Sequence, residues 1–375
     1  MNLHVFNDSH GYNLKLVIDR CQSLGGFEKN IFINLNKKIL HKNDNAEYLN
    51  NNILSFKKRI KSLPDIDTII LCPLDYVTAY FLLELKQIHP SAKVKWIFWS
   101  YEFYHQPEKY KNLLLSFSYQ YYLKHNSLLN HLKQKLKFYI KNILSIPVYN
   151  IHILNQSRKK VNTLYAFLPQ DSKNVFKEID NTNCEYQQIS LISIEQITKN
   201  IKAKELSNEI IIGHSARPTG NHAEVLEMLS EISFQNKLFI PLAHGDKIYK
   251  RLIKNKAINL FGNQVSFLEE EMEMQFYFKR LSTIGFAIFN FVMQEGLGNI
   301  LFLLWNGAKI FLRKESNVYI QFKAWGLHVF SLEDDLNEIN LNNLLEEQYV
   351  TQNKTILENR FNEEKINDYW KPLFQ

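Results

Sequence analysis

Two short segments of this 375-residue chain combine glycine with polar side chains in a way that suits binding of an anion. Residues 213–222 (GHSARPTGNH) follow the apolar run 210–212, and residues 293–299 (MQEGLGN) follow the apolar run 284–292. Each segment precedes a stretch with helical spacing of apolar residues. A loop that leads from a strand into a helix offers free backbone N–H groups and the positive end of the helix dipole. Both loops are therefore candidate binding sites for a diphosphate.

The side chains of the two loops extend this prediction. Ser215 and Arg217 could donate hydrogen bonds to phosphate or ribose, while Glu295 is an isolated acid in an apolar region and needs a partner. That partner could be a sugar hydroxyl or a structural Lys or Arg. Asn221 with Glu224 resembles a capping box, and an ordinary strand-to-helix turn explains the first loop equally well. The candidate binding residues are Gly213, His214, Ser215, Arg217, Asn221, His222, Tyr249, Gln294, Glu295, Gly296, Gly298 and Asn299.

Candidate acid–base residues lie in the N-terminal half. Asp8 and His10 follow the apolar run 3–6, and Glu102 follows the Trp-rich run 94–99. Each stands where a parallel strand would deliver a side chain to its carboxyl end. Each could orient or deprotonate a hydroxyl group, and a structural role in a turn is equally open.

The elements that position these residues alternate along the chain. Strand-like runs at 3–6, 31–35, 68–72, 94–99, 148–154 and 163–168 alternate with helical spacing in the first half, and a similar series spans 210–312. This pattern is typical of parallel α/β sheets, in which ligands bind at the carboxyl ends of the strands. We expect a first domain over 1–195, a second over 205–350, and a C-terminal helix over 351–375 that packs back on the first domain.

The basic charge of the chain, which is +7 overall, gathers in its first half. Residues 109–170 contain ten Lys or Arg and no Asp or Glu, and Lys133, Lys137 and Lys141 form a stripe beside apolar residues at helical spacing. A basic amphipathic helix of this kind favours peripheral binding to an anionic membrane surface. The alternative is a helix whose lysines are only solvated.

Several function classes lack their motifs. The three cysteines are widely spaced, which argues for a reducing compartment and against a zinc site or a disulfide framework. Asp65-Ile-Asp67 precedes a strand, so we read it as a surface turn and expect no bound metal. No GxGxxG, Walker or GxSxG motif is present, and the basic stretch has no nucleic-acid-binding pattern. The N-terminus does not resemble a signal peptide.

With these residues in view, the chain resembles glycosyltransferase family 56, the bacterial TDP-Fuc4NAc:lipid II Fuc4NAc transferases. The resemblance lies in residues 4–8, 99–104, 211–215, 221–226, 244–249, 294–299, 304–312 and 329–331. It implies a GT-B architecture, with two Rossmann-like domains facing a cleft.

The same resemblance implies a function. A TDP-sugar would bind the C-terminal domain, and a polyprenyl-linked saccharide acceptor would meet the N-terminal domain at the cytoplasmic face of the bacterial plasma membrane, without a bound metal or other cofactor. Two departures from the family lie in the donor site: His214 stands where members tend to have Asn, and Met293-Gln-Glu295 where some have Arg-Gln-Gln, so the exact donor sugar is left open. Glu102 replaces an Asp of the family's corresponding turn. A transferase of the same fold with another nucleotide sugar and a non-catalytic sugar-binding protein are the alternatives.

Overall fold

The computed structural model describes residues 1–36, 41–49, 53–125, 150–180, 183–199, 201 and 205–375. The predicted lysine stripe at 133, 137 and 141 lies outside these residues. The chain divides into two compact units. The first comprises Met1–Gln106, Ser127–Leu191 and Ile366–Gln375, and the second comprises Pro107–Asn126 and Ile192–Lys365.

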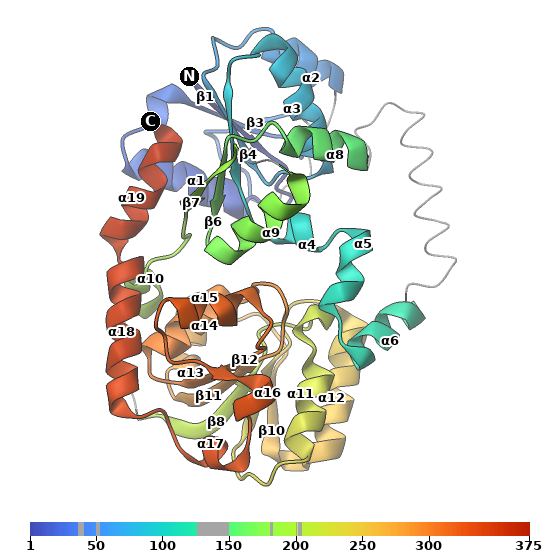
Figure 1. Ribbon diagram of the computed structural model, residues 1–375, viewed down its shortest axis with the longest axis vertical. Helices are drawn as coiled ribbons and strands as arrows, with labels where there is room; N and C mark the ends of the chain where they lie inside the picture. Colours follow the sequence, from blue (N-terminus) through green and yellow to red (C-terminus); the bar gives the residue numbers. More distant parts are fainter. Residues whose placement is uncertain (37–40, 50–52, 126–149, 181–182, 200, 202–204) are drawn as a thin grey trace. The chain divides into compact units, whose positions relative to one another are not determined.

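The first unit is built on a seven-stranded parallel sheet with the order β3-β2-β1-β4-β5-β6-β7 (Figure 1). Its strands are β1 (Asn2–Phe6), β2 (Asn30–Asn34), β3 (Glu47–Tyr48), β4 (Thr68–Cys72), β5 (Lys93–Ile97), β6 (Thr163–Ala166) and β7 (Glu185–Gln188). Its principal helices are α1 (Tyr12–Ser23), α2 (Ile53–Ile60), α3 (Tyr76–Ile88), α4 (Tyr101–Tyr104), α8 (Ile151–Arg158) and α9 (Pro169–Ile179).

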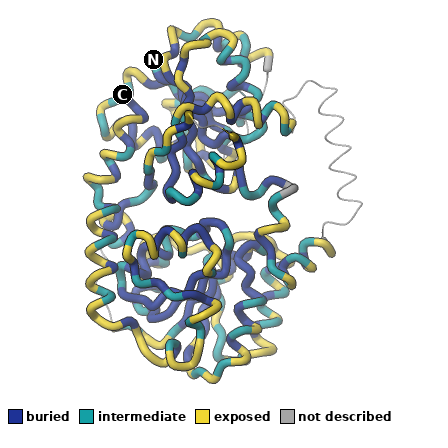
Figure 2. Tube along the Cα trace, viewed as in Figure 1, coloured by how far each residue is buried: buried dark blue, intermediate teal, exposed yellow. Residues whose placement is uncertain are grey.

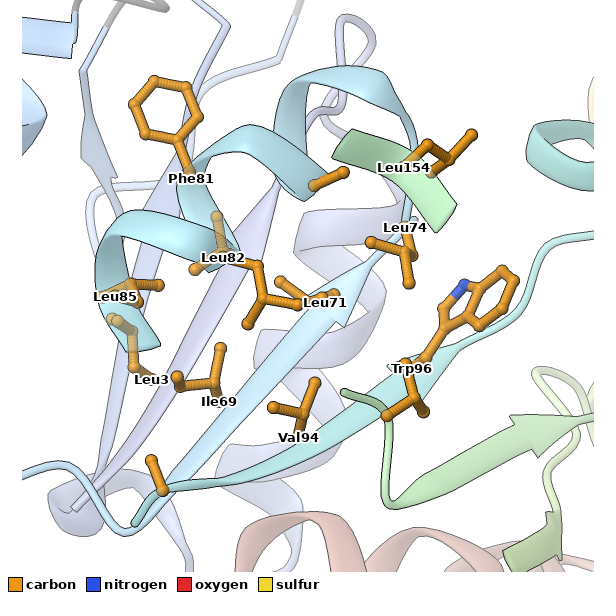
Figure 3. Close-up of a cluster of buried hydrophobic side chains, with 14 of the residues drawn as sticks. Leu3, Ile69, Leu71, Leu74, Phe81, Leu82, Leu85, Val94, Trp96 and Leu154 are labelled. Atoms are coloured by element: carbon orange, nitrogen blue, oxygen red, sulfur yellow. The ribbon is translucent and has the colours of Figure 1, made fainter. Parts of the chain in front are cut away.

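The core of this unit forms where α3 and α8 cover the middle strands. Figure 3 shows Leu3, Ile69 and Val94 of three adjacent strands directed toward Leu82 and Leu85 of α3, with Trp96 and Leu154 beside them. The central strand β4 is buried along its whole length because helices cover the sheet on both sides, as is usual for parallel sheets. On the face opposite this core, β1 carries Asn2 and His4, and β5 carries Lys93 and Lys95. The resulting rigid platform fixes the loops that leave β1, β4 and β5.

The second unit contains a six-stranded parallel sheet with the order β10-β9-β8-β11-β12-β13. Its strands are β8 (Ser207–Ile212), β9 (Leu238–Pro241), β10 (Val265–Leu268), β11 (Ile284–Phe289), β12 (Lys309–Leu312) and β13 (Phe330–Ser331). Its helices include α6 (Ser116–His125), α10 (Ile194–Thr198), α11 (His222–Ser230), α12 (Lys247–Phe261), α13 (Met274–Leu281), α14 (Leu297–Trp305), α15 (Asn317–Ala324), α16 (Leu332–Asp335), α17 (Glu338–Asn342) and α18 (Glu347–Phe361). The buried colouring of Figure 2 runs through the central strands of both sheets.

The last helix, α19 (Glu363–Phe374), contributes to the first unit. The Trp370 indole N–H donates to the Ser190 carbonyl at 2.7 Å, and the Phe374 ring lies 5.7 Å from the His4 ring. Among the described residues, no helix is long and apolar enough to cross a membrane.

One sequence-based prediction of local structure needs correction. The segment 148–154, predicted as a strand, is outside the described residues up to 149 and then begins helix α8. The Asn150 side chain accepts the backbone N–H groups of His152 and Ile153, so its capping bonds start a helix despite the β-branched residues nearby. The segment that leads up to the predicted domain boundary between 195 and 205 contains β7 and α10.

Candidate functional site

In the second unit the strand order reverses between β8 and β11, which lie side by side at the centre of the sheet. The chain leaves β8 toward β9 on one side, and leaves β11 toward β12 on the other. At such a reversal the two loops after the strands diverge and leave room for a ligand. The loops are residues 213–221 and 290–296, so the two predicted binding segments meet at one edge of the sheet.

The loop after β8 is shaped by the His222 ring, which packs against two glycines. Gly213 has φ 65°, and a β-carbon there would lie 2.3 Å from Nε2 of His222. A β-carbon on Gly220 would lie 2.5 Å from Cε1 of the same ring. Burial lowers the pKa of His222 to about 4, and its backbone N–H donates to the Tyr249 hydroxyl at 3.2 Å. His222 and Tyr249 thus support the loop from inside.

Asn221 ties this loop to its surroundings and does not cap α11, so the predicted capping box is wrong. It has φ 48° and makes no side-chain cap bond. Its amide group donates to the carbonyls of Leu113, Thr219 and Asn290, and its oxygen accepts the Leu115 N–H at 2.9 Å. The left-handed backbone turns the side chain away from the helix, so it joins β11 and the segment before α6.

Glu224, the other member of the predicted capping box, serves a different helix. Its carboxylate accepts the backbone N–H groups of Phe117 and Ser118 at 2.9 and 3.2 Å. These are donors of the first turn of α6, which an acid stabilises. Asp246 caps α12 and accepts the Tyr121 hydroxyl at 2.6 Å, so α6 is fixed to the loops after β8 and β9.

The loop after β11 ends at Gly296, which precedes the first residue of α14 and has φ 61°. A β-carbon on Gly296 would lie 2.8 Å from Cγ of His214, so the imidazole lies directly over this glycine. Gly298 has no such constraint, since its nearest neighbour would be 4.0 Å away. The N-cap residue of α14 is a glycine and so has no side chain to cap the helix, and no side chain among the described residues makes a cap hydrogen bond there. This nine-residue helix thus presents backbone N–H groups at the switch point.

The ionisable and polar side chains around Gly296 are unusual because they are buried and make few hydrogen bonds. Burial raises the pKa of Glu295, an effect that Thr219 and Arg217 oppose. The nearest imidazole nitrogen, Nε2 of His214, is 3.8 Å from Oε2 of Glu295, and burial lowers the pKa of that histidine to about 3. Within the described residues, no hydrogen bond of normal geometry reaches either Glu295 oxygen, the Gln294 amide oxygen or the Thr219 hydroxyl, although the Thr219 hydroxyl lies near enough to Glu295 to oppose the rise in its pKa. These four polar atoms lie at the edge of the second sheet where the two loops meet, and they are available to hydrogen-bond a ligand.

The remaining predicted residues surround this group. The Ser215 hydroxyl lies 3.2 Å from Nε2 of His214, and Arg217 is exposed on the same loop. Asn299, in the first turn of α14, donates to the Tyr277 hydroxyl at 2.8 Å. Sequence reasoning did not select Thr219, Tyr277 or Asn290. Thr219 lay inside the predicted loop and could have been found there, whereas the other two are recognised only from long-range contacts.

The first unit has its own switch point between β1 and β4, but there an internal carboxylate occupies the helix N-terminus. Oδ1 of Asp8 accepts the N–H groups of His10 and Gly11, both at 3.0 Å, and Oδ2 accepts those of Asn13 and Leu14 at 2.9 and 3.1 Å. The last two donors belong to the first turn of α1. Asp8 therefore fills the position that a phosphate would take in a dinucleotide-binding domain.

Glu102 is the second buried acid of this unit. Its Oε1 accepts the Trp96 indole N–H at 3.0 Å and the Trp99 backbone N–H at 2.9 Å. Its Oε2 has no hydrogen-bond partner among the described residues. Burial raises the pKa of this carboxyl to about 7 despite these hydrogen bonds. His10, in contrast, is exposed on the loop after β1. The structure does not bring Asp8, His10 and Glu102 into one hydrogen-bonded group.

The described residues contain no group of three His, Cys, Asp or Glu side chains that could hold a metal ion. The uncapped α14 terminus and the unpartnered polar atoms beside it are the features that point to a ligand.

A family model for group 56 glycosyltransferases, described as 4-alpha-L-fucosyltransferase, matches residues 78–372. The chain belongs to glycosyltransferase group 56. The match spans strands β5 to β13 and includes both loops of the second-unit site. The protein is a glycosyltransferase, as the sequence resemblance predicted.

Solved structures confirm the GT-B fold. Anabaena HepE, in complex with UDP and glucose, superposes with a TM-score of 0.62 at 12% identity, covering 99% of this chain and 98% of that chain. The α,α-trehalose 6-phosphate synthase of Burkholderia multivorans gives a TM-score of 0.62 at 9% identity, covering 100% and 95%. An E. coli trehalose-6-phosphate protein bound with UDP-2-fluoro glucose gives 0.60 at 10%, covering 100% and 99%. At these identities the likeness extends to the fold of two parallel-sheet, Rossmann-like domains.

Proposed function

We propose that this group 56 glycosyltransferase binds the diphosphate of its nucleotide-sugar donor at the N-terminus of α14. The uncapped terminus at Gly296 carries the proposal, because its N–H groups lie at the strand reversal beside four unpartnered polar atoms. The equivalent place in the first unit is filled by Asp8, which disfavours a phosphate there. Complexes of HepE with UDP and UDP-glucose are consistent with a nucleotide-sugar donor for the same fold.

The proposed site suits the charge that develops during transfer. When the bond between the sugar and the diphosphate breaks, negative charge grows on the leaving phosphate. The positive end of α14 and the Arg217 guanidinium would stabilise that charge without rearrangement. The Glu295 carboxylate, which has no hydrogen-bond partner of normal geometry among the described residues, would accept hydrogen bonds from hydroxyl groups of the donor. Ser215, Gln294 and Asn299 would complete the polar contacts.

The acceptor would be activated by the first unit. Among the three acid–base candidates, Asp8 has both oxygens occupied by backbone donors, so we assign it a positioning role. Glu102 retains a free oxygen, and its pKa of about 7 suits a general base at neutral pH. His10 is the alternative base, because its imidazole is exposed.

The specific reaction that we propose moves an amino-deoxy sugar of the Fuc4NAc type from TDP to a polyprenyl-diphosphate-linked saccharide. The reaction would take place at the cytoplasmic face of the bacterial plasma membrane, without a metal cofactor. It rests on the resemblance of residues 294–299 and 304–312 and on the family described as fucosyltransferases. A different nucleotide sugar, used in capsule or lipopolysaccharide assembly, is the alternative within this fold.

The donor proposal is tested by thermal unfolding of the purified protein with TDP, UDP, GDP and NAD. A ligand that binds only the folded state adds about 2.7 kcal/mol at a hundredfold excess over its dissociation constant. We expect TDP to give the largest rise in Tm. A larger rise in Tm with UDP or GDP would mean that the donor sugar is carried by that nucleotide instead of TDP. No rise in Tm with any nucleoside diphosphate would refute the proposed site.

Peripheral membrane binding needs a separate test. Anionic phosphatidylglycerol vesicles are expected to carry the protein upward in a flotation gradient, and neutral phosphatidylcholine vesicles are not. Replacing Lys133, Lys137 and Lys141 by Gln should abolish flotation, since each lysine near an anionic surface contributes about 1 kcal/mol. Replacing Lys57, Lys58 and Lys61 is the matched control. Unchanged flotation of the first variant would contradict the predicted stripe.

A further inference from the structure

Three ring side chains lie in a row at the carboxyl edge of the first sheet. His10 and Tyr12 have ring centroids 6.5 Å apart with planes only 12° from parallel, and Tyr12 and His41 lie 5.0 Å apart at 40°. The His41 backbone N–H donates to the His10 carbonyl at 3.2 Å, which connects the two segments that carry the outer rings. We call His10, Tyr12 and His41 the aromatic shelf.

All three residues of the aromatic shelf are exposed. Tyr12 is the first residue of α1, and 62% of its surface is accessible, more than for any other exposed aromatic residue in the described chain. A single exposed tyrosine needs no explanation, but several exposed rings side by side are a feature of binding surfaces. None of His10, Tyr12 and His41 belongs to the buried core of this unit.

The position of the shelf points to a ligand, and the chemistry beneath it excludes an anion. The shelf follows β1 at the strand reversal between β1 and β4, where α/β sheets bind their ligands. Directly before it, Asp8 is buried and uses both carboxylate oxygens on backbone N–H groups, including the first turn of α1. The N-terminus of α1 therefore has no free positive end for a phosphate, and its carboxylate would repel one.

We propose that the aromatic shelf is a stacking subsite for one uncharged pyranose ring of the acceptor saccharide. The C–H bonds on one face of a pyranose carry a small positive charge, which is attracted to the negative face of an aromatic ring. The flanking imidazoles of His10 and His41 can each offer a nitrogen to the hydroxyl groups at the rim of the sugar. His10 then contacts the acceptor as a binding residue, while Glu102 stays the base. This inference rests on the proposed function, because it assumes that the acceptor is bound by the first unit.

The test is saturation-transfer NMR on the intact protein with the methyl glycosides of N-acetylglucosamine and glucose as probes. We expect transfer to the C–H protons of one sugar face in the wild type. Tyr12→Phe should retain the effect because it keeps the ring, and Tyr12→Ala should weaken binding by about fivefold or more, the loss expected for one ring contact. Ile88→Ala is the matched control, since Ile88 is an exposed apolar residue (39%) at the far end of α3. It should leave the transfer unchanged.

The outcomes separate this inference from the donor proposal. The nucleoside diphosphate shift in Tm should be equal in the wild type and in Tyr12→Ala, because the donor binds the second unit. Equal saturation transfer in the wild type and Tyr12→Ala would overturn the subsite, as would a similar loss in Ile88→Ala or absence of transfer in the wild type. If nucleoside diphosphates do not raise the Tm of the wild type but saturation transfer to the sugar is still seen, the donor site is refuted and the stacking subsite stands. Tm without ligand shows that each variant is folded.

Discussion

The imidazole of His214 covers Gly296 so closely that a β-carbon on the glycine would lie 2.8 Å from Cγ of the histidine. This contact joins the loop after β8 to the start of α14, and it places the imidazole beside Glu295. A side chain at position 296 would also be strained by the backbone, which has φ 61°. The shape of the proposed diphosphate site therefore depends on this pair.

Gly296→Ala is accordingly expected to lose donor binding, with Gly298→Ala as its control. The added methyl group must displace His214 or distort the N-terminus of α14, so we expect the TDP-induced rise in Tm to disappear and the stability to fall by about 1–2 kcal/mol. Gly298 has room for a methyl group, and alanine favours the helix by about 1 kcal/mol. Equal TDP responses in the two variants would show that the diphosphate does not contact this turn.

Asp8→Ala is expected to destabilise the first unit without removing a catalytic group. Four backbone N–H donors lose their carboxylate, which costs about 2–4 kcal/mol in the free energy of unfolding. Asp8→Asn should be only a partial replacement, because its NH₂ group faces two of those donors. Chemical denaturation at several phosphate concentrations measures both effects.

The phosphate series also tests whether Asp8 occupies an anion position. Inorganic phosphate should stabilise Asp8→Ala more than it stabilises the wild type, since the emptied position offers the helix terminus to an anion. Identical phosphate dependence in the two proteins would mean that the carboxylate position is not accessible to phosphate.

The architecture could be predicted from the sequence because it depends on local patterns. The apolar runs at 68–72 and 284–292 and the polar loops after them identify strands of a parallel sheet, and the structure has β4 and β11 at these runs. Local capping also explains the error at 150–154, where the Asn150 cap outweighs the β propensity of the residues around it.

The roles of individual site residues could not be predicted in the same way. The sequence shows that Asn221 and Glu224 are three residues apart, but not that residues 113–118 of a distant segment supply their partners. Likewise, Asp8 looks like an acid–base candidate until its four backbone donors are seen. Both cases depend on tertiary contacts, which the local sequence pattern does not reveal.

Asn221 provides the third prediction, which separates a backbone effect from a side-chain effect. Asn221→Gly keeps the left-handed backbone but removes four hydrogen bonds, so we expect a loss of about 2–3 kcal/mol in the free energy of unfolding. Asn221→Ala should lose about 1 kcal/mol more, because alanine disfavours φ 48°. Limited proteolysis should find cleavage near α6 in both variants. If both remain as stable as the wild type, Asn221 does not hold the segment before α6.

Glu102→Gln provides the fourth prediction, through its effect on stability as a function of pH. The pKa of Glu102 in the folded protein is about 7, above its ordinary value of 4.5, because burial disfavours the charged form. Folding therefore favours the protonated carboxyl. Its contribution to stability is complete below pH 4.5 and is lost as the pH rises through 7, a change of about 3 kcal/mol.

Glutamine cannot ionise, so the difference in unfolding free energy between Glu102→Gln and the wild type should grow in favour of the variant over pH 4.5–7 and then level off. Urea denaturation across this range measures the difference. Activity should depend on pH in the opposite sense to stability, because a general base must be ionised. The rate of transfer by the wild type should therefore fall as the pH drops below 7. The glutamine variant should be inactive at every pH. Parallel stability profiles would show that Glu102 titrates near its ordinary pKa. A glutamine variant with full activity would move the role of base to His10, whose exposed imidazole could then be tested by His10→Gln.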